Sequence, residues 1–336
     1  MLSESEFTVK GHGVHTAYLE LTAALRKRPD IDIAVNEDRP ADITHFQTIG
    51  FYAMKRLLFG PGKKVVSAHV VPASVVGSIA LAKYWKSVFR LYMKWFYGRA
   101  DLVLAVSKMV KEELEQDMGL KNVALFYNTI NMAHYARTDG EKAAARKVLD
   151  IAPDAFVVVG NGQIQPRKRF DIFVRMAQEM PEAQFVWVGG IPFKNLAAEY
   201  AKMKRMVSKT PGNLLVTDVI PLEEVRKYLH AADVFVLPAE QENHPMCVLE
   251  AAGSGLPVVL RNIPQYDDTF ADAALLADSD DDFVRIVREL RDSPKKRTAA
   301  TKKSAAIAKR FDSGQGAKRA VAFYRSLLDA QAGEFR

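Results

Sequence analysis

Residues 232–260 read ADVFVLPAEQENHPMCVLEAAGSGLPVVL, and this stretch decides the fold. A valine-rich apolar run ends at Pro238, a polar loop follows, and a helical pattern begins near Met246. A second valine-rich run starts after Pro257. This order indicates two parallel strands joined by a crossover helix, because parallel neighbours need a long connection.

The same alternation recurs along the whole chain of 336 residues. The sequence predicts buried strands at 63–71, 100–107, 122–128, 155–162, 183–190, 213–219, 232–238 and 256–262. Helical patterns lie between them, among others at 169–180, 222–232 and 246–255. Alternating strands and helices are typical of parallel sheets covered by helices.

The alternation occurs twice, and a polar stretch at 128–147 separates the two series. We therefore expect an α/β fold with two Rossmann-like domains. Residues 1–130 form the first and 150–311 the second, and a C-terminal helix at 312–336 returns toward the first. The opening MLSES leaves little length for the strand that should precede a first helix. That strand is either truncated, or the chain begins downstream of the true start.

Composition limits the class of protein. Hydrophobic residues make up 49% of the chain, yet no run approaches the roughly 18 apolar residues of a membrane-spanning helix. No signal-peptide pattern precedes the first acidic residues, so we expect a cytoplasmic location. The single cysteine, Cys247, excludes an intramolecular disulfide and fits a reducing compartment. Cysteine and histidine never cluster at zinc-ligand spacing, so no structural metal is expected.

Positive charge is concentrated in one sector. The net charge is +7, and residues 43–100 contain no Asp or Glu. The bases in that sector are Lys55, Arg56, Lys63, Lys64, Lys83, Lys86, Arg90, Lys94 and Arg99. Such a patch attracts an anionic partner, which could be nucleic acid, anionic lipid or an acidic protein.

In open parallel sheets, ligands bind at the carboxyl ends of the strands, and polar chemistry stands at several of these ends. Gly13 precedes a helix, and His69 follows an apolar strand. Gly162 ends another strand, with the basic cluster of residues 167–169 shortly after it. Backbone amides and cations at a helix start can hold a phosphate. The alternatives are an ordinary turn at Gly13, a structural histidine at His69 and a solvated basic helix start.

Two acids flank the helix start in residues 232–260. Glu242 lies in the loop after the strand, and Glu250 lies on the second turn of the helix that follows Pro245. Free amides of the loop suit a diphosphate, while Glu242 can accept from hydroxyls beyond it and Glu250 from a ribose. This arrangement indicates a nucleotide sugar. The alternative is two solvated carboxylates. Cys247 on the apolar helix face indicates a core residue rather than a nucleophile.

Glu242 and Glu250, continued by LEAAGSGLPVVLRNIPQY, resemble the acid pair of retaining glycosyltransferases of family 4, which have the two-domain GT-B fold. GQIQPRKRFDIFVRMAQ resembles the family's donor-phosphate segment, VIPLEEVRKYLHAADVFVLP its base-binding region, and GHGVHTAYLEL its N-terminal glycine loop. ENHPM and LRNIPQY are most similar to bacterial glycosyltransferases that act on diacylglycerol or glycosyl-diacylglycerol.

The resemblance implies an active site in the cleft between the domains, with roles for particular residues. His69 and Glu242 would act on the transferred sugar. The donor-binding residues would be Gly13, Gly162, Gln163, Arg167, Lys168, Val219, Asn243, His244, Met246 and Glu250. Two departures stand out: Gln163 replaces an expected arginine, so Arg167 or Arg169 would supply the charge, and Asn243-His244-Pro245 replaces a glycine-rich loop.

The stretch at 81–99 indicates a helix that lies on a membrane. Lys83, Lys86, Arg90 and Lys94 fall within an arc of about 80°, and Trp85 and Phe89 take the opposite side. A cationic face opposite an aromatic face is typical of interfacial helices. The alternative is a core helix with a solvated basic face. No nucleic-acid motif accompanies the charge, which favours a membrane over nucleic acid.

These patterns predict a retaining hexosyltransferase that moves glucose or galactose from UDP to a glycerolipid, either diacylglycerol or its monoglycosyl form. It would act from the cytoplasmic side as a peripheral protein of the cell membrane. No cofactor or essential metal is expected, because the Asp30-Ile31-Asp32 motif opens a predicted strand instead of ending one. The alternatives are a soluble or polysaccharide acceptor, and a non-catalytic nucleotide-sugar-binding or membrane scaffold protein.

Overall fold

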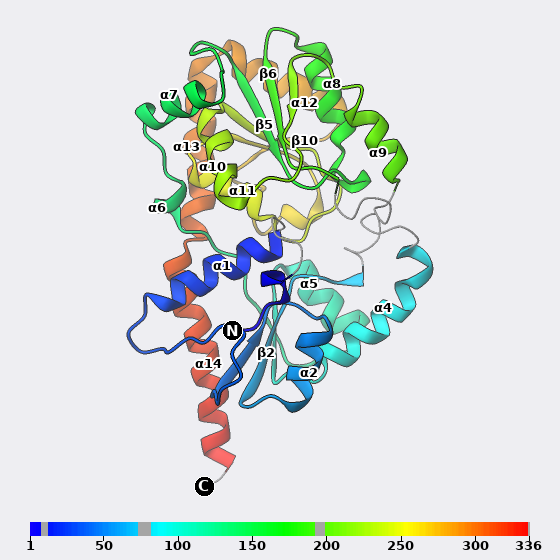
Figure 1. The fold of residues 1–336 in the computed structure, drawn as a ribbon, viewed down its shortest axis with the longest axis vertical. Helices are drawn as coiled ribbons and strands as arrows, with labels where there is room; N and C mark the ends of the chain where they lie inside the picture. The colour runs from blue at the N-terminus through cyan, green and yellow to red at the C-terminus, as the bar shows by residue number, and fades with distance from the viewer. Residues whose placement is uncertain (8–12, 73–81, 192–198, 335–336) are drawn as a thin grey trace. The chain divides into compact units, whose positions relative to one another are not determined.

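The computed structural model describes residues 1–7, 13–72, 82–191 and 199–334, with the side chains of 82–86 and 331–334 left out. The chain forms two compact units (Figure 1). Of the described residues, the first unit contains 1–7, 13–72, 83–131 and 311–334, and the second contains 82, 132–191 and 199–310. Each unit is built on a parallel sheet, which confirms the predicted α/β class with two Rossmann-like halves.

The sheet of the first unit has four parallel strands in the order β1-β2-β3-β4. These are β1 (Ile43–Phe46), β2 (Lys63–Ala68), β3 (Leu102–Ala105) and β4 (Val123–Leu125). The connecting helices are α1 (Gly13–Arg26), α2 (Phe51–Phe59), α4 (Ala82–Tyr97) and α5 (Lys108–Glu112), the last continued by a π-helical turn (Glu113–Asp117). Ser107 caps α5 as its sequence indicates, accepting from the Val110 amide at 3.2 Å.

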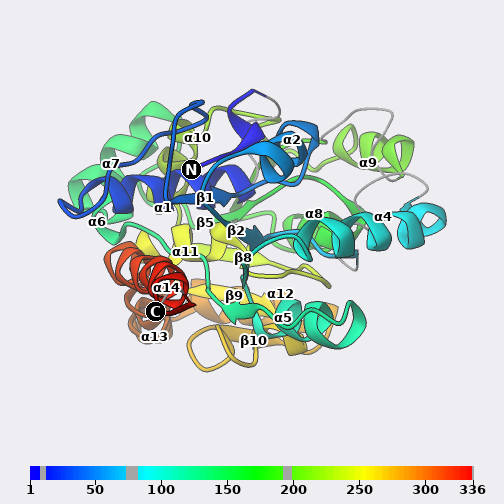
Figure 2. The ribbon, with the colours of Figure 1, turned by 90° about the horizontal axis from the view of Figure 1, so that it is seen from below.

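The C-terminal helix α14 (Ser313–Glu334) packs against α1 in this unit (Figure 1). Buried aliphatic side chains on the two helices, such as Leu21, Leu25 and Val321, share one core with Val65 and Leu104 of the strands. Apolar burial of this kind contributes about 25 cal/mol per Å². Helix α4 projects away from β2 with its N-terminal end outermost (Figure 2).

The strand expected before α1 is reduced to a single bridge. Leu2 pairs with Phe46 of β1 in the parallel sense, through its amide on the His45 carbonyl and its carbonyl on the Gln47 amide, each 2.8 Å. The strand predicted to open at Asp30 is not formed, so that expectation was wrong.

The sheet of the second unit has six parallel strands in the order β10-β9-β8-β5-β6-β7. The strands are β5 (Val157–Asn161), β6 (Gln184–Val188), β7 (Leu214–Val216), β8 (Val234–Leu237), β9 (Val258–Arg261) and β10 (Leu275–Ala277). Trp187 of β6 is fully buried between Phe170 and Phe173, with ring centroids 5.1 Å from each.

Helices cover the faces of this sheet (Figure 1). They are α6 (Met132–Tyr135), α7 (Asp139–Val148), α8 (Phe170–Glu179), α9 (Tyr200–Val207), α10 (Leu222–Ala231), α11 (Met246–Gly253), α12 (Asp280–Asp292) and α13 (Pro294–Arg310). Helices α8, α10 and α11 lie where the sequence predicts them.

The strand order of the second unit fixes where a ligand can bind. The chain runs from β5 outward to β6 and β7, and then returns to the other side of β5 to form β8, β9 and β10. Strands β5 and β8 are therefore the two neighbours from which the connections diverge. Ligands of such sheets bind at the carboxyl ends of strands at this switch point.

Candidate active site

Glycine shapes the carboxyl end of β5. Gly162 has φ +149°, a backbone conformation that side-chain-bearing residues rarely adopt. Gly189, after β6, has φ +130°, and a Cβ there would lie 2.3 Å from the Gly162 carbonyl oxygen. Trp187 Nε1 donates to the same carbonyl at 2.9 Å. The two strand ends therefore approach more closely than other residues allow, which fixes the loop that follows β5.

Lys168 lies over Gly162 and reaches the acid of the opposite loop. A 3₁₀ turn (Pro166–Lys168) begins at a proline and brings the Lys168 ammonium within 3.5 Å of where a Gly162 Cβ would be. Lys168 is only 7% exposed and forms an ion pair with Glu242, which is 6% exposed. Arg167 Nη1 lies 3.2 Å from Glu242 Oε1 and donates to the Gln241 carbonyl at 2.8 Å. Two cations therefore surround one buried carboxylate.

Two opposing effects act on the pKa of Glu242. Burial by itself would raise the pKa of this carboxyl. The charges of Lys168 and then Arg167, with the hydrogen bonds they donate, outweigh burial and hold the pKa below its usual range. Glu242 is accordingly ionised at neutral pH.

Glu250 is buried on α11, at 2% exposure. Asn161, the last residue of β5, donates from Nδ2 to Glu250 Oε2 at 3.1 Å. The alternative of two solvated carboxylates is therefore wrong. Cys247 is also buried, and burial raises the pKa of its thiol to about 12, so the thiol stays protonated and lies in the core as expected.

His244 takes the place of a glycine-rich segment between the acids. Its side chain is 4% exposed, and its ring lies against Phe270 with centroids 5.0 Å apart. Burial lowers its pKa to about 3, so the ring is neutral. Met246 is buried beside it, and Asn243 accepts from the Gln241 amide at 3.4 Å.

The buried His244 should make stability depend on pH. In the unfolded chain its imidazole takes up a proton near pH 6.5, whereas in the folded chain it does so only near pH 3. The unfolded state thus binds more protons below pH 6.5, so stability falls as the pH drops through this window. At pH 5 the loss from this residue is about 2 kcal/mol.

Urea unfolding at pH 7 and pH 5 tests this expectation. His244→Gln should lose less stability between the two pH values than the wild type does, because glutamine does not titrate. An equal loss in both proteins would contradict it.

The remaining residues of the second unit that were predicted to bind the donor are Gln163, Arg167 and Val219. Gln163 accepts from the Gln165 amide at 2.9 Å. Of the two arginines expected to replace its missing charge, Arg167 lies beside Glu242, whereas Arg169 is paired with other acids. Val219 follows β7 and is 58% exposed.

His69 and Gly13 belong to the first unit. His69 directly follows β2, and its Nε2 hydrogen-bonds Gln47 Oε1 at 2.9 Å. The acceptor is an amide oxygen, so the imidazole donates from Nε2. Gln47 in turn lies 3.1 Å from Nε2 of the buried His45. Gly13 opens α1, and a Cβ there would meet nothing within 4 Å.

Two polar residues of this arrangement were not predicted. Asn161 ends a strand that was predicted for its valines, and Gln47 follows β1, which was not predicted. The alternation of polar and apolar residues in ITHFQT, which precedes α2, was the signal in the sequence that could have predicted β1 and Gln47.

Among the described residues, no three His, Cys, Asp or Glu side chains gather as metal ligands would. No described helix is long and apolar enough to cross a bilayer.

Comparison with known proteins matches both units. Residues 141–306 match the model for glycosyl transferases group 1, and residues 13–134 match that for glycosyltransferase family 4. The alpha-galactosylglucosyldiacylglycerol synthase of Streptococcus pneumoniae is 33% identical over 276 residues, which cover 79% of this chain and 72% of that protein. The chain is a family 4 glycosyltransferase.

Further relatives agree with this family 4 glycosyltransferase assignment. The processive diacylglycerol alpha-glucosyltransferase of Acholeplasma laidlawii is 26% identical over 272 residues, 80% of each chain. The crystal structure of Anabaena HepE with UDP and glucose has a TM-score of 0.77 at 16% identity, and covers 97% of this chain and 98% of its own. The likeness in structure establishes the GT-B fold, and the family models and relatives establish a hexosyltransferase.

Proposed function

We propose that this family 4 enzyme transfers glucose or galactose from UDP to a glycerolipid, with retention of configuration, at the cytoplasmic face of the membrane. One observation carries the proposal: a buried ion pair of Lys168 with Glu242 lies beside the Asn161–Glu250 hydrogen bond at the β5/β8 switch point. The first two relatives, named as glycolipid synthases, support the lipid acceptor.

The ion pair can exchange partners when a donor binds. A diphosphate brings negative charge that Lys168 and Arg167 can take up, because both already lie at the strand ends as cations. Glu242 is then released from its cations and can accept from hydroxyls of the hexose. As the sugar leaves the diphosphate, charge develops on the phosphate oxygens, and the preorganised Lys168 stabilises it.

Glu250 and Asn161 suit the nucleoside end of the donor. The carboxylate of Glu250 accepts a hydrogen bond from Asn161, and a carboxylate is the kind of acceptor that suits ribose hydroxyls. His69, which donates from Nε2 to Gln47, is proposed to act on the transferred sugar. Retention is proposed because UDP-hexoses carry the α configuration and the two relatives are named for α products.

A Glu250→Ala variant should bind UDP more weakly while the fold is kept. Losing one hydrogen bond between a charged group and a ribose hydroxyl costs about 1.5–3 kcal/mol, which weakens binding by about ten- to a hundredfold. Calorimetric titration with UDP measures this effect. Asp154→Asn, at an exposed carboxylate before β5, is the control. Affinities within twofold of each other in all three proteins would refute the role of Glu250.

We propose that transfer needs no metal, because cations of the chain stand where a metal would neutralise the diphosphate. Activity should therefore persist in excess EDTA. Initial rates with and without EDTA and added Mn²⁺ measure this. Complete loss in EDTA that Mn²⁺ restores would count against a role for Lys168 and Arg167 as the sole diphosphate cations.

The described part of helix α4 supports contact with a membrane in its outer half. Its inner half is core, since Met93, Phe96 and Tyr97 are at most 2% exposed. Farther out, Val88 and Leu91 are 55% and 68% exposed, and they lie to one side of the exposed bases Arg90 and Lys94. The side chains of Lys83, Trp85 and Lys86 lie outside the described residues. Exposed apolar residues beside a row of cations suit an anionic lipid surface.

Helix α2 carries a second exposed stripe. Phe51 and Phe59 are 86% and 82% exposed, and Leu58 is 44% exposed. These residues recur at spacings of seven and eight, so they share one face of the helix with the exposed Lys55. Tyr92 of α4 donates to the Ile49 carbonyl, just before α2, so the two helices are neighbours. Exposed aromatic residues in an acid-free sector support a lipid-facing surface.

Release of UDP from UDP-hexose tests the proposed function. Release should accelerate when glycerolipid vesicles are added and should not respond to soluble sugars. Acceleration by a soluble sugar or a polysaccharide would instead assign a soluble acceptor, and vesicle sedimentation at low salt would then show no binding. Binding of UDP-hexose without any turnover would leave a non-catalytic scaffold.

A further inference from the structure

Arg169 has a strained backbone at the start of α8. Its φ and ψ are 51° and 48°, the left-handed region that residues with a Cβ rarely enter. It stands at the N-cap position without making a side-chain cap. Strained backbone persists where surrounding interactions over-determine it, and it clusters at functional sites. The contacts of the Arg169 side chain are therefore the interactions expected to hold this backbone conformation in place.

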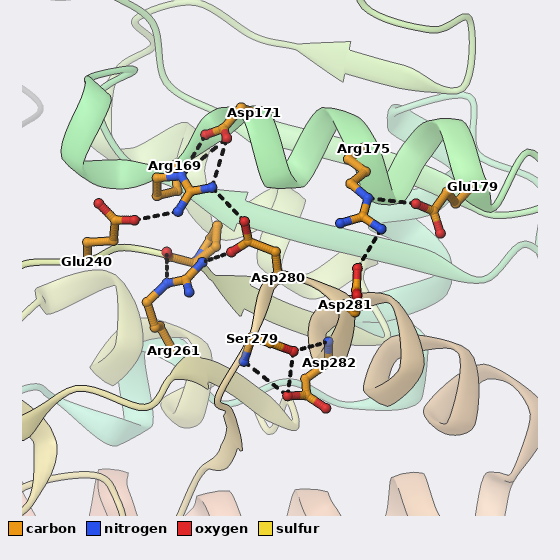
Figure 3. Close-up of polar contacts among 11 residues, drawn as sticks. Arg169, Asp171, Arg175, Glu179, Glu240, Arg261, Ser279, Asp280, Asp281 and Asp282 are labelled. Atoms are coloured by element: carbon orange, nitrogen blue, oxygen red, sulfur yellow. Dashed lines mark hydrogen bonds and ion pairs between the residues drawn. The ribbon is translucent and has the colours of Figure 1, made fainter.

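That side chain joins three separate segments (Figure 3). Arg169 Nε and Nη2 each donate at 3.0 Å to the two oxygens of Asp171, in the first turn of α8. Nη2 also donates to Asp280 Oδ2 at 2.8 Å, at the start of α12. Nη1 donates to Glu240, in the loop between β8 and α11. The guanidinium thus ties the donor-phosphate turn to the loop that carries Glu242.

The two consecutive cations hold two acids of one loop. Lys168 pairs with Glu242, and Arg169 pairs with Glu240 two residues earlier. Arg169, in the left-handed conformation, stands between the 3₁₀ turn and α8, and the side chains of Lys168 and Arg169 reach two different acids of the loop. The Glu240 amide also donates to the Arg167 carbonyl at 2.9 Å, which holds the turn and the loop together along their backbones.

A second arginine anchors the beginning of the same loop. Arg261 of β9 donates from Nε to the Pro238 carbonyl at 3.0 Å and pairs with Asp280. Asp280 therefore lies between Arg169 and Arg261 (Figure 3). The loop is held at Pro238 by Arg261 and at Glu240 by Arg169. The side chains of this network form their ion pairs with one another and with Asp171, rather than with Glu242 or Glu250.

We propose that Arg169 is a positioning residue of the transfer reaction, whose ion pair with Glu240 sets the distance of Glu242 from Lys168. It acts through these two residues and does not touch the donor itself. On this proposal the strained backbone of Arg169 is retained because it allows the guanidinium to pair with Glu240. The expected effect on kcat rests on the proposed function, whereas the effect on the distance between Glu242 and Lys168 concerns the protein without a donor.

Glu240→Gln breaks the pair with little disturbance elsewhere, because the Glu240 side chain is half exposed, at 53%. We expect kcat for UDP release to fall about tenfold, since small misplacements of reacting groups have effects of this size. The melting temperature should stay within about 4 °C of the wild type, because exposed ion pairs contribute little. Asp171→Asn is the matched control. Asp171 pairs with the same arginine but lies outside the loop that carries Glu242, so kcat should stay within twofold of the wild type.

Arg169→Gly separates positioning from stability. Glycine adopts the left-handed conformation without strain, so the fold should persist although the ion pairs are lost. We expect the same loss of kcat as in Glu240→Gln, and no further loss when the two substitutions are combined. Losses that multiply in the double variant would show that the two residues act independently, and would overturn the proposal.

Carbon-13 NMR titration of the Glu242 carboxyl tests the geometry without any donor, with Glu242→Gln used to assign the signal. In Glu240→Gln, looser contact with Lys168 should raise the Glu242 pKa by about one pH unit. Loss of the negative charge on Glu240 would alone lower that pKa, so the sign discriminates. A lowered or unchanged pKa would overturn the proposal. A raised pKa in an enzyme that consumes no UDP-hexose would uphold positioning and refute only the proposed function.

Discussion

Glu242→Gln should lower the rate of hexose transfer by about a hundred- to ten-thousandfold. The carboxylate of Glu242 is ionised and buried, and once donor phosphate draws Lys168 and Arg167 away it can accept two hydrogen bonds from the hexose. Two bonds to a charged group contribute about 1.5–3 kcal/mol each, and each 1.36 kcal/mol is a factor of ten in rate. Initial rates at saturating donor and acceptor measure the loss.

The choice of glutamine follows from burial. Outright loss of one partner from a buried ion pair costs about 3–5 kcal/mol of stability, and the Glu242 side chain is only 8% exposed. Glutamine keeps the volume and an oxygen facing Lys168, so the variant should remain folded and still bind UDP. Asp154→Asn, at an exposed acid before β5, is the control. A folded Glu242→Gln enzyme with a rate within threefold of wild type would refute the assignment.

Replacing Lys83, Lys86, Arg90 and Lys94 together by glutamine should release the protein from anionic vesicles. Each base near such a surface contributes about 1 kcal/mol, so four lost charges reduce partitioning by on the order of a thousandfold. Donor binding should be unchanged, because Lys168, Glu242 and Glu250 lie in the other unit. Sedimentation with vesicles of mixed zwitterionic and anionic lipid, at several salt concentrations, measures the change.

Matched variants distinguish binding through one membrane-facing surface from general electrostatic attraction of a basic protein to anionic vesicles. Glutamine at Lys295, Lys302, Lys309 and Lys209 removes four exposed bases from the second unit and should leave vesicle binding nearly intact. Phe51→Ser with Phe59→Ser should weaken binding with less dependence on salt, because that contribution is apolar. Both phenylalanines are exposed, so stability should hold. A quadruple α4 variant that binds like wild type would end the claim for α4.

The predicted strands were confirmed where valine dominates, as in β5 and β8, because these runs are buried on both faces of a parallel sheet. β1 was missed because its sequence ITHF places Thr44 and His45 inside, where hydrogen bonds satisfy them. β10 was missed because three residues carry too little pattern. The strand expected at Asp30 failed because Asp30 and Asp32 pair with surface arginines instead.

The charged residues of the candidate site could be predicted from the sequence, whereas their contacts could not. Glu242, Glu250 and Lys168 follow from residue type and position after a strand. Their burial does not, because it depends on partners far along the chain, such as Asn161, which is 89 residues from Glu250. The left-handed backbone of Arg169 leaves no trace in a sequence without a glycine at that position.

The most direct test of the account is a radiolabelled transfer assay that pairs UDP-glucose and UDP-galactose with vesicles of diacylglycerol or monoglucosyl-diacylglycerol. One donor should label one of these lipids in the α configuration, and Glu242→Gln should abolish the label. Transfer of label to a soluble sugar but to neither lipid, from either donor, would contradict it.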